Sequence, residues 1–268
     1  MNFDTGSSDL FLPGSDCDST CDGHTLYNPS ASSTSSDFGQ TFELQYGDSG
    51  HGSTVSGEQY TDIVTLAGYK VSFNCTAYIL LSLTDICQAT GQRLGAAKNY
   101  PSAFQPNQQP ADGLLGMGYA SISMYGASPV FQTLVSQGQV STPEFGFYFA
   151  ESGSELHIGG TNPNLYTGPF TYTPVTKKVK MHGTVVPSIF FLTIIFQGFW
   201  QCLFDGISVN GKSVIGSSSA VIDTGTTMVV GDTQSVQDFY DQIPGSRYVS
   251  KGFWTSAFMS WLSGRSTD

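Results

Sequence analysis

Asp4-Thr5-Gly6-Ser7-Ser8, near the start of the 268-residue chain, returns as Asp223-Thr224-Gly225-Thr226-Thr227. One run of Asp-Thr-Gly and two hydroxyl residues would arise by chance in roughly one chain of this composition in a hundred, and two would be far rarer. Alone, either copy could be a strand-to-turn corner, in which the aspartate accepts backbone N–H groups and the glycine supplies conformational freedom. The repeat instead predicts an internal duplication into two lobes.

Two carboxyl groups held side by side have a specific chemistry. They cannot both ionise, so in acid one proton stays bound between them. A water molecule placed across such a pair can attack a peptide carbonyl, because one carboxyl group accepts a proton while the other donates one. The sequence therefore predicts Asp4 and Asp223 as a catalytic pair, with water as the nucleophile and with no metal or cofactor.

The residues after each aspartate have the chemistry to support this pair. The glycines let the two backbones approach, the threonines can hydrogen-bond across the junction of the lobes, and the next hydroxyl can orient the outer carboxylate oxygen. The predicted supporting residues are Thr5, Gly6, Ser7, Thr224, Gly225 and Thr226.

Composition places the chain among globular, strand-rich proteins. Only 12% of residues are charged, and short apolar or alternating runs at 42–46, 59–66, 144–149 and 155–158 lie between Gly, Ser, Asp and Pro clusters. Helical periodicity is confined to 129–137 and 233–243. The net charge of −11 argues against nucleic acid or an anionic membrane as partner and fits an acidic working environment. The predicted class is mainly β.

Five cysteines include a close pair, Cys17 and Cys21, in a Ser/Asp/Gly-rich stretch. The pair could close a small disulfide loop, which indicates secretion, and the alternative is two free thiols. No signal peptide precedes Asp4, because Met1-Asn2-Phe3 leaves no room for one. We therefore expect the chain to be truncated at its start.

Further segments match the pattern of the pepsin-like aspartic proteases, in order along the chain. They are Asp9-Leu10-Phe11-Leu12-Pro13, with Phe11 where that family usually has Trp, Tyr27-Asn28-Pro29-Ser30 through Ser32-Ser33-Thr34, Tyr46-Gly47-Asp48-Ser49-Gly50, Asp112-Gly113-Leu114-Leu115-Gly116, and Ile158-Gly159-Gly160 through Tyr166-Thr167-Gly168. The chain resembles this family over most of its length, and the fungal secreted branch most.

The resemblance implies further roles. Tyr46 and its neighbours are similar to the flap hairpin that covers the substrate, although without the resemblance Tyr46 would be an ordinary strand aromatic before a turn. The segment containing Leu114 looks like the element that braces the first catalytic loop. The predicted substrate-binding residues are Tyr46, Gly47, Asp48 and Leu114.

Two segments interrupt the family pattern, at 71–88 and 179–197. A lysine precedes each segment, which begins with Val, carries Leu-Thr near its end and finishes with Gln. The codons for these residues can read as the two ends and the branch region of an intron. We predict two short retained introns. A sequon at Asn74 and Cys87 fall in the first, and the apolar run 187–196 of the second is too short to span a membrane, which needs about 20 residues.

The resemblance thus implies a mainly β, bilobed fold, truncated at both ends, with lobes at 1–158 and 159–268. It implies an endopeptidase that cleaves proteins or peptides at acid pH, acts as a monomer without a cofactor, and is secreted or vacuolar. The four histidines lack motif partners and are expected at the surface: His24, His51, His157 and His182. Two alternatives stay open, namely an inactive, truncated relative that serves as a binding module and a carbohydrate-binding β-sandwich.

Overall fold

The computed structural model describes residues 1–47, 54–66, 87–176, 198–250 and 253–255. In this part of the chain strands predominate, with two short α-helices and four single-turn 3-10 helices, so the predicted β class is confirmed. The helices α1 (Val130–Ser136) and α2 (Thr233–Tyr240) lie where helical periodicity predicts them. Helix α1 begins directly after Pro129, and the carboxylate of Asp232 caps α2 by accepting the Ser235 N–H at 3.0 Å.

The described residues form two compact units. The first contains 1–47, 54–66, 87–172, 198–200 and 222–225, and the second contains 173–176, 201–221, 226–250 and 253–255. This division differs from the lobes predicted at 1–158 and 159–268, because 159–172 and the loop around the second Asp-Thr-Gly belong to the first unit. The two-lobed organisation stays a prediction.

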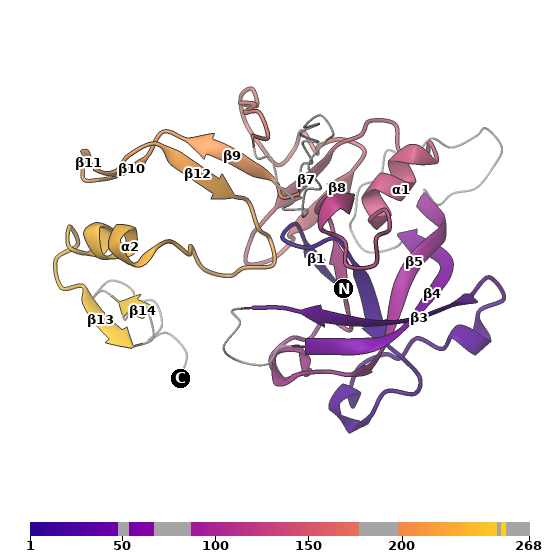
Figure 1. Cartoon of the computed structure of the whole chain (residues 1–268). Helices are drawn as coiled ribbons and strands as arrows, with labels where there is room; N and C mark the ends of the chain where they lie inside the picture. Colours follow the sequence, from indigo (N-terminus) through magenta and orange to yellow (C-terminus); the bar gives the residue numbers. More distant parts are fainter. Residues whose placement is uncertain (48–53, 67–86, 177–197, 251–252, 256–268) are drawn as a thin grey trace, which may run out of the picture. The chain divides into compact units, whose positions relative to one another are not determined.

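A six-stranded sheet organises the first unit (Figure 1). Its order is β1 (Asn2–Asp4), β6 (Leu114–Gly116), β2 (Leu10–Pro13), β5 (Cys87–Asn99), β4 (Thr54–Leu66) and β3 (Ser36–Gln45). Strand β6 pairs parallel with β1 and antiparallel with β2. The first Asp-Thr-Gly begins at the last residue of β1 and continues into the connection to β2, so both ends of that connection are hydrogen-bonded to the same strand.

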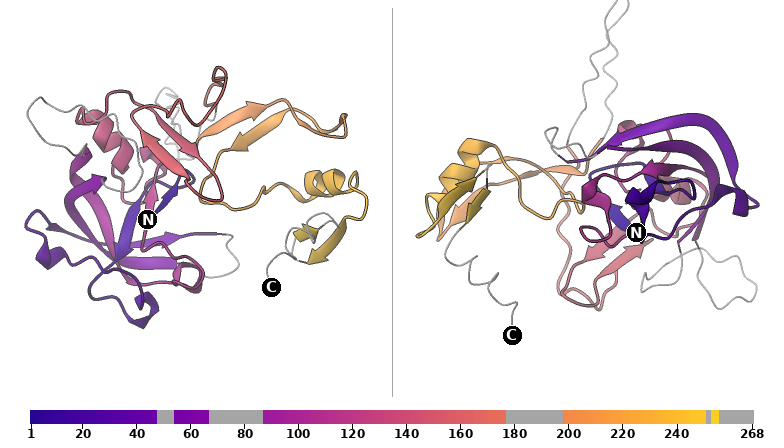
Figure 2. Two further views of the ribbon diagram at one scale, coloured as in Figure 1. Left: turned by 180° about the vertical axis from the view of Figure 1, so that it is seen from behind. Right: turned by 90° about the horizontal axis from the view of Figure 1, so that it is seen from below.

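The long strands β3, β4 and β5 form an antiparallel meander that curves in the view from below (Figure 2). Buried residues alternate along the first half of β4, as expected for a strand with one face on the core. The β4–β5 register shifts next to Gly57, where a Cβ atom would overlap the Ala96 carbonyl oxygen. The close approach of β4 to β5 therefore requires glycine at this position.

Two apolar clusters fill the first unit. One packs α1 against the sheet, and the other is an aromatic cluster around Phe11, which is fully buried. Rings in this second cluster meet mainly edge to face, with Phe11 centred 5.8 Å from Tyr100 and 5.4 Å from Phe104. The hairpin of β7 (Phe145–Tyr148) and β8 (Glu155–Ile158) adds Leu156 and Ile158 to the first cluster.

The second unit consists of three two-stranded pairs and α2. Strand β9 (Gln201–Phe204) pairs with β12 (Ser218–Val221), β10 (Ile207–Val209) with β11 (Lys212–Ile215), and β13 (Arg247–Ser250) with β14 (Phe253–Thr255). The turn between β10 and β11 uses Asn210 and Gly211, both with positive φ, which is the usual chemistry of a tight hairpin. None of the described helices is long and apolar enough to cross a bilayer.

Several sequence expectations meet the structure here. A disulfide joins Cys17 and Cys21, as predicted. The surface position expected for His24 and His157 is wrong, since they are only 8% and 7% exposed. His24 can be buried because both ring nitrogens have partners, Nε2 the Phe104 carbonyl at 2.8 Å and Nδ1 the Asp112 carboxylate at 3.4 Å, while its ring lies edge-on to Tyr100. His157 is buried on β8, between Leu156 and Ile158 of the first cluster, with Nδ1 3.4 Å from a Glu155 carboxylate oxygen.

Other expectations fall on residues outside the described part. His51, His182, Asn74 and the whole segment 179–197 lie there, as does 71–86. Of the first predicted intron, Cys87 and Gln88 alone are described, and they open β5 by pairing with Leu66 and Thr65 of β4. The intron hypothesis stays a prediction.

Candidate active site

The two Asp-Thr-Gly loops meet within the first unit and are tied by reciprocal hydrogen bonds. The Thr5 N–H donates to Thr224 Oγ1 at 3.0 Å, and the Thr224 N–H donates to Thr5 Oγ1 at 2.9 Å. Each hydroxyl also donates to a backbone carbonyl of the opposite loop, Thr5 to Ile222 at 2.7 Å and Thr224 to Phe3 at 2.6 Å. Four bonds over such short segments fix the separation of the two loops.

The two glycines bring each carboxyl group against the opposite loop. A Cβ atom built on Gly6 would lie 2.6 Å from the carboxyl carbon and from both oxygens of Asp223. A Cβ atom on Gly225 would overlap the carboxyl group of Asp4 in the same way. Each glycine N–H also donates to its own aspartate at 2.8 Å. The carboxyl groups therefore occupy the space that the missing side chains leave.

Asp4 sits in an environment that favours a bound proton. It is 5% exposed, and burial raises the pKa of its carboxyl group. The hydrogen bonds from Ser7 Oγ, at 2.5 Å, and from the Gly6 N–H lower that pKa, while the hydrogen bond with Asp223 and the charge of Asp223 raise it. The net effect is a raised pKa, so this carboxyl group keeps a proton at higher pH than an exposed aspartate.

The strand β6 and the residues after it hold the Asp4 loop from behind. Gly116 faces the Ser8 backbone, where a Cβ atom would come within 2.5 Å. The Met117 N–H donates to the Asp4 carbonyl at 2.7 Å, and the Gly118 N–H donates to the Ser7 carbonyl at 2.7 Å. The Ser8 hydroxyl returns a bond to the Tyr119 carbonyl at 2.7 Å.

Trp200 connects this bracing segment to the second loop. Its indole N–H donates to the Met117 carbonyl at 2.8 Å, and its ring centre lies 4.6 Å from that of Tyr119. Its own carbonyl accepts the Ile222 N–H at 2.9 Å, one residue before Asp223. No sequence motif predicts this role. A tryptophan with a polar partner is a common anchor, but nothing in the residues around Trp200 indicates which carbonyl it reaches.

Of the predicted substrate-binding residues, Tyr46 and Gly47 directly follow β3, and Leu114 lies in β6, in the cluster against which Tyr46 packs. Tyr46 packs its ring 5.6 Å from Phe11, and burial, then the charges of Asp9 and Asp4, raise the pKa of its hydroxyl. Gly47 is exposed with φ of 75°, Asp48 lies outside the described residues, and Leu114 is 3% exposed in the aromatic cluster. Their contact with substrate stays a prediction, as does the orienting role of Thr226.

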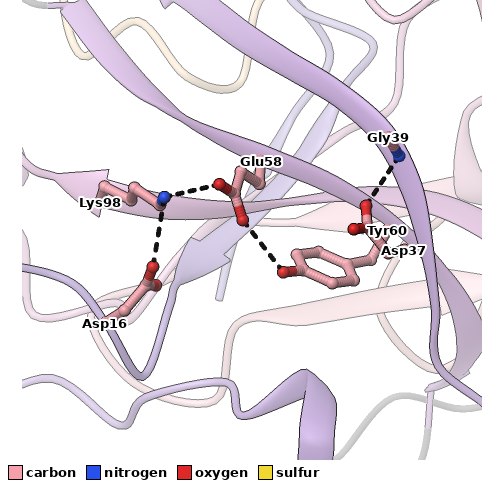
Figure 3. Close-up of polar contacts among 6 residues, drawn as sticks. All are labelled: Asp16, Asp37, Gly39, Glu58, Tyr60 and Lys98. Carbon is pink, nitrogen blue, oxygen red and sulfur yellow. Dashed lines mark hydrogen bonds and ion pairs between the residues drawn. The ribbon is translucent and has the colours of Figure 1, made fainter.

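A hollow among the described residues lies elsewhere, beside β3, β4 and β5. It measures about 390 Å³ and is lined by Thr41, Phe42, Glu43, Ser56, Gly57, Glu58 and Lys98. Its single cation is already paired, with Lys98 Nζ 2.6 Å from Glu58 and 3.4 Å from Asp16, and Glu58 also accepts the Tyr60 hydroxyl (Figure 3). Because no residue of either motif lines it, this hollow is a weaker candidate than the aspartate pair.

Metal ligation has no support in the described part of the chain, where no group of three His, Cys, Asp or Glu side chains could hold an ion. The candidate site therefore consists of two carboxyl groups, one of them buried, on two loops that are hydrogen-bonded to each other. Such a pair can exchange a proton with a water molecule and with a polarised carbonyl group.

Comparison with known proteins agrees with this chemistry. A family model described as eukaryotic aspartyl protease matches residues 1–79 and 80–258. An aspartic protease of Phaffia rhodozyma is 37% identical over 248 residues, which are 92% of this chain and 50% of that protein. Cathepsin E of Cavia porcellus is 31% identical over 94% of this chain and 55% of its own length. Pepsin A of Sus scrofa is 31% identical over 91% of this chain and 54% of its own length. The chain spans about half the length of the curated relatives it matches.

Proposed function

Since the chain belongs to the eukaryotic aspartyl protease family, we propose that it is an aspartic-type endopeptidase that hydrolyses peptide bonds of proteins in acid. The observation that carries the proposal is the mutual packing of Asp4 and Asp223 against Gly225 and Gly6, locked by the two threonines. No other cluster among the described residues combines a buried carboxyl group, a second carboxyl group and a rigid support.

In the proposed mechanism the two carboxyl groups share one proton. The ionised group takes a proton from a water molecule, the water oxygen attacks the peptide carbonyl carbon, and the protonated group gives its proton to the carbonyl oxygen. The tetrahedral intermediate collapses when the leaving nitrogen is protonated and the C–N bond breaks. Ser7 and the two glycine N–H groups orient the carboxylate oxygens, and the threonine bonds keep the pair from separating.

The remaining parts of the proposal follow from the family. The substrate is a protein or peptide, with Tyr46 and Gly47 of the flap segment covering it and no cofactor taking part. The protein is secreted or vacuolar and acts as a monomer, with lobes at 1–158 and 159–268 each supplying one aspartate. The Cys17–Cys21 disulfide supports an oxidising compartment.

Hydrolysis of an acid-denatured protein tests the proposal. The full chain should cleave it, and Asp4→Asn should abolish cleavage because the amide cannot exchange the shared proton. Asp22→Asn, which changes an exposed acid of the same unit, is the matched control and should cleave normally. Cleavage by the Asp4→Asn chain at the wild-type rate would contradict the proposed mechanism.

An inactive, peptide-binding relative is the second candidate. The supports of the two aspartates differ, since β1 and β2 both pair with β6, whereas β12, which precedes Asp223, pairs with β9 and no other described strand. Asp223 is also partly exposed, unlike Asp4. Binding of a peptide without its cleavage, with wild-type and Asp4→Asn chains alike, would favour this second function.

A further inference from the structure

Asp9, five residues beyond the first catalytic aspartate, is a second buried carboxyl group that the proposed mechanism does not use. It is 5% exposed, like Asp4. Its oxygens accept three hydrogen bonds from one segment, at 2.5 Å from the Ser123 hydroxyl, 2.7 Å from the Met124 N–H and 3.3 Å from the Tyr125 N–H. Its own carbonyl accepts the Gly116 N–H at 2.9 Å.

These bonds complete a series that runs between residues 4–9 and 116–125. Asp4, Ser7 and Ser8 bond to Met117, Gly118 and Tyr119 at one end, as described above, and Asp9 closes the series at the other. Asp9 is the one carboxyl group in the series apart from Asp4. Its bonds span more than a hundred residues of chain, so they fix tertiary structure and not a local turn.

Asp9 makes no ion pair with any described residue. The titratable groups that face it are the hydroxyls of Tyr46 and Tyr125, whose pKa its charge raises. Arg93, the cation that reaches this segment, donates to the Tyr125 carbonyl at 3.1 Å instead. Burial raises the pKa of the Asp9 carboxyl group and outweighs the three hydrogen bonds, which lower it.

We propose that Asp9 is a positioning residue for Asp4. Its hydrogen bonds to the segment 123–125, called the clamp, hold that segment and through it the bracing residues 116–119, most firmly in acid. The part that concerns Asp4 rests on the proposed function. Protonated Asp9 can donate to Ser123 Oγ while its other oxygen keeps the Met124 N–H, so the clamp survives protonation. Ionised Asp9 leaves a buried charge without a cation, which costs free energy.

The sign of the pH dependence follows from linkage. A carboxyl group whose pKa is higher in the folded than in the unfolded protein binds more protons when folded. Its contribution to stability is complete below the unfolded pKa and is lost as pH rises through the folded pKa. Asparagine has the donor and acceptor pattern of the protonated acid at every pH, so Asp9→Asn should remove this dependence.

Thermal unfolding of the full chain between pH 3 and pH 7 tests the clamp. Relative to wild type, the midpoint of Asp9→Asn should rise with pH, by about 2–4 °C for every tenfold difference in proton affinity between folded and unfolded Asp9. Asp22→Asn, at an exposed acid of the same unit, is the matched control. A constant difference between Asp9→Asn and wild type across this range would overturn the proton-linked clamp.

Kinetics test the positioning role. Asp9→Ala removes both carboxyl oxygens and the three hydrogen bonds that they accept, so kcat should fall about tenfold. Asp9→Asn should restore most of the loss at pH 3. Unchanged kcat in a folded Asp9→Ala protein would overturn the role. If Asp9→Ala does not fold, a kcat of Asp9→Asn at pH 3 about tenfold below that of wild type would overturn it. If wild type cleaves nothing, the proposed function fails by itself, and the unfolding measurements still decide whether Asp9 is the clamp.

Discussion

Replacing Gly6 by alanine gives the sharpest test of the geometry at the aspartate pair. The new Cβ atom would lie 2.6 Å from three atoms of the Asp223 carboxyl group, whereas ordinary contacts begin at 3.4 Å. The carboxyl group must therefore retreat by about 0.8 Å, the difference between these two distances. A misplacement near 1 Å can cost about a hundredfold in rate, or about 2.7 kcal/mol of transition-state stabilisation. Gly6 does not have positive φ, so backbone strain adds nothing.

The assay is kcat/KM for a peptide substrate in acid, measured together with thermal unfolding. Gly6→Ala should lower kcat/KM about a hundredfold, mostly through kcat, because the displaced group acts in the transition state. Gly216→Ala is the matched control, since a Cβ atom there meets nothing within 4 Å and its φ is not positive. A folded Gly6→Ala protein with more than half of the wild-type kcat/KM would show that Asp223 does not need this position.

Three further predictions concern the same unit. Thr224→Ala removes the donor to the Phe3 carbonyl and the acceptor of the Thr5 N–H, so the free energy of unfolding in urea should fall by about 2 kcal/mol, and Thr224→Ser should recover most of it. Ser7→Ala removes a hydrogen bond that lowers the pKa of Asp4, so the high-pH limb of the kcat/KM profile should move to higher pH; an unmoved limb would contradict this assignment. Replacing both Cys17 and Cys21 by alanine should cost about 2 kcal/mol in oxidising buffer, for a loop closed at a sequence separation of 4, and little in reductant.

The sequence predicted the features that depend on local chemistry. The repeated Asp-Thr-Gly identifies the loops, because only glycine permits the approach that Gly6 and Gly225 make, and threonine has the length to reach across. The element at Leu114 was placed correctly behind the first loop by its resemblance to the family, and in the structure it is β6. These features need no knowledge of distant partners.

Features that depend on distant partners could not be predicted. Asp9 reads in the sequence as the polar start of a strand, and its burial becomes visible only once Ser123, Met124 and Tyr125 are placed on it. His24 was expected at the surface because no motif accompanies it, yet its Nε2 bonds the Phe104 carbonyl, which any residue could provide, and its Nδ1 lies 3.4 Å from the distant Asp112 carboxylate. Backbone carbonyls leave no trace in a sequence, so side chains that bind them are systematically missed.

The two Asp-Thr-Gly copies are alike in sequence but not in how they are held. The loop of Asp4 is fixed by β6 on both sides and by the residues that follow β6, so its position is set by the sheet. The loop of Asp223 is fixed by Thr5, Phe3 and the Trp200 carbonyl. Because these three contacts come from the first loop and from Trp200, which bonds the brace, we expect damage to the brace to displace both carboxyl groups.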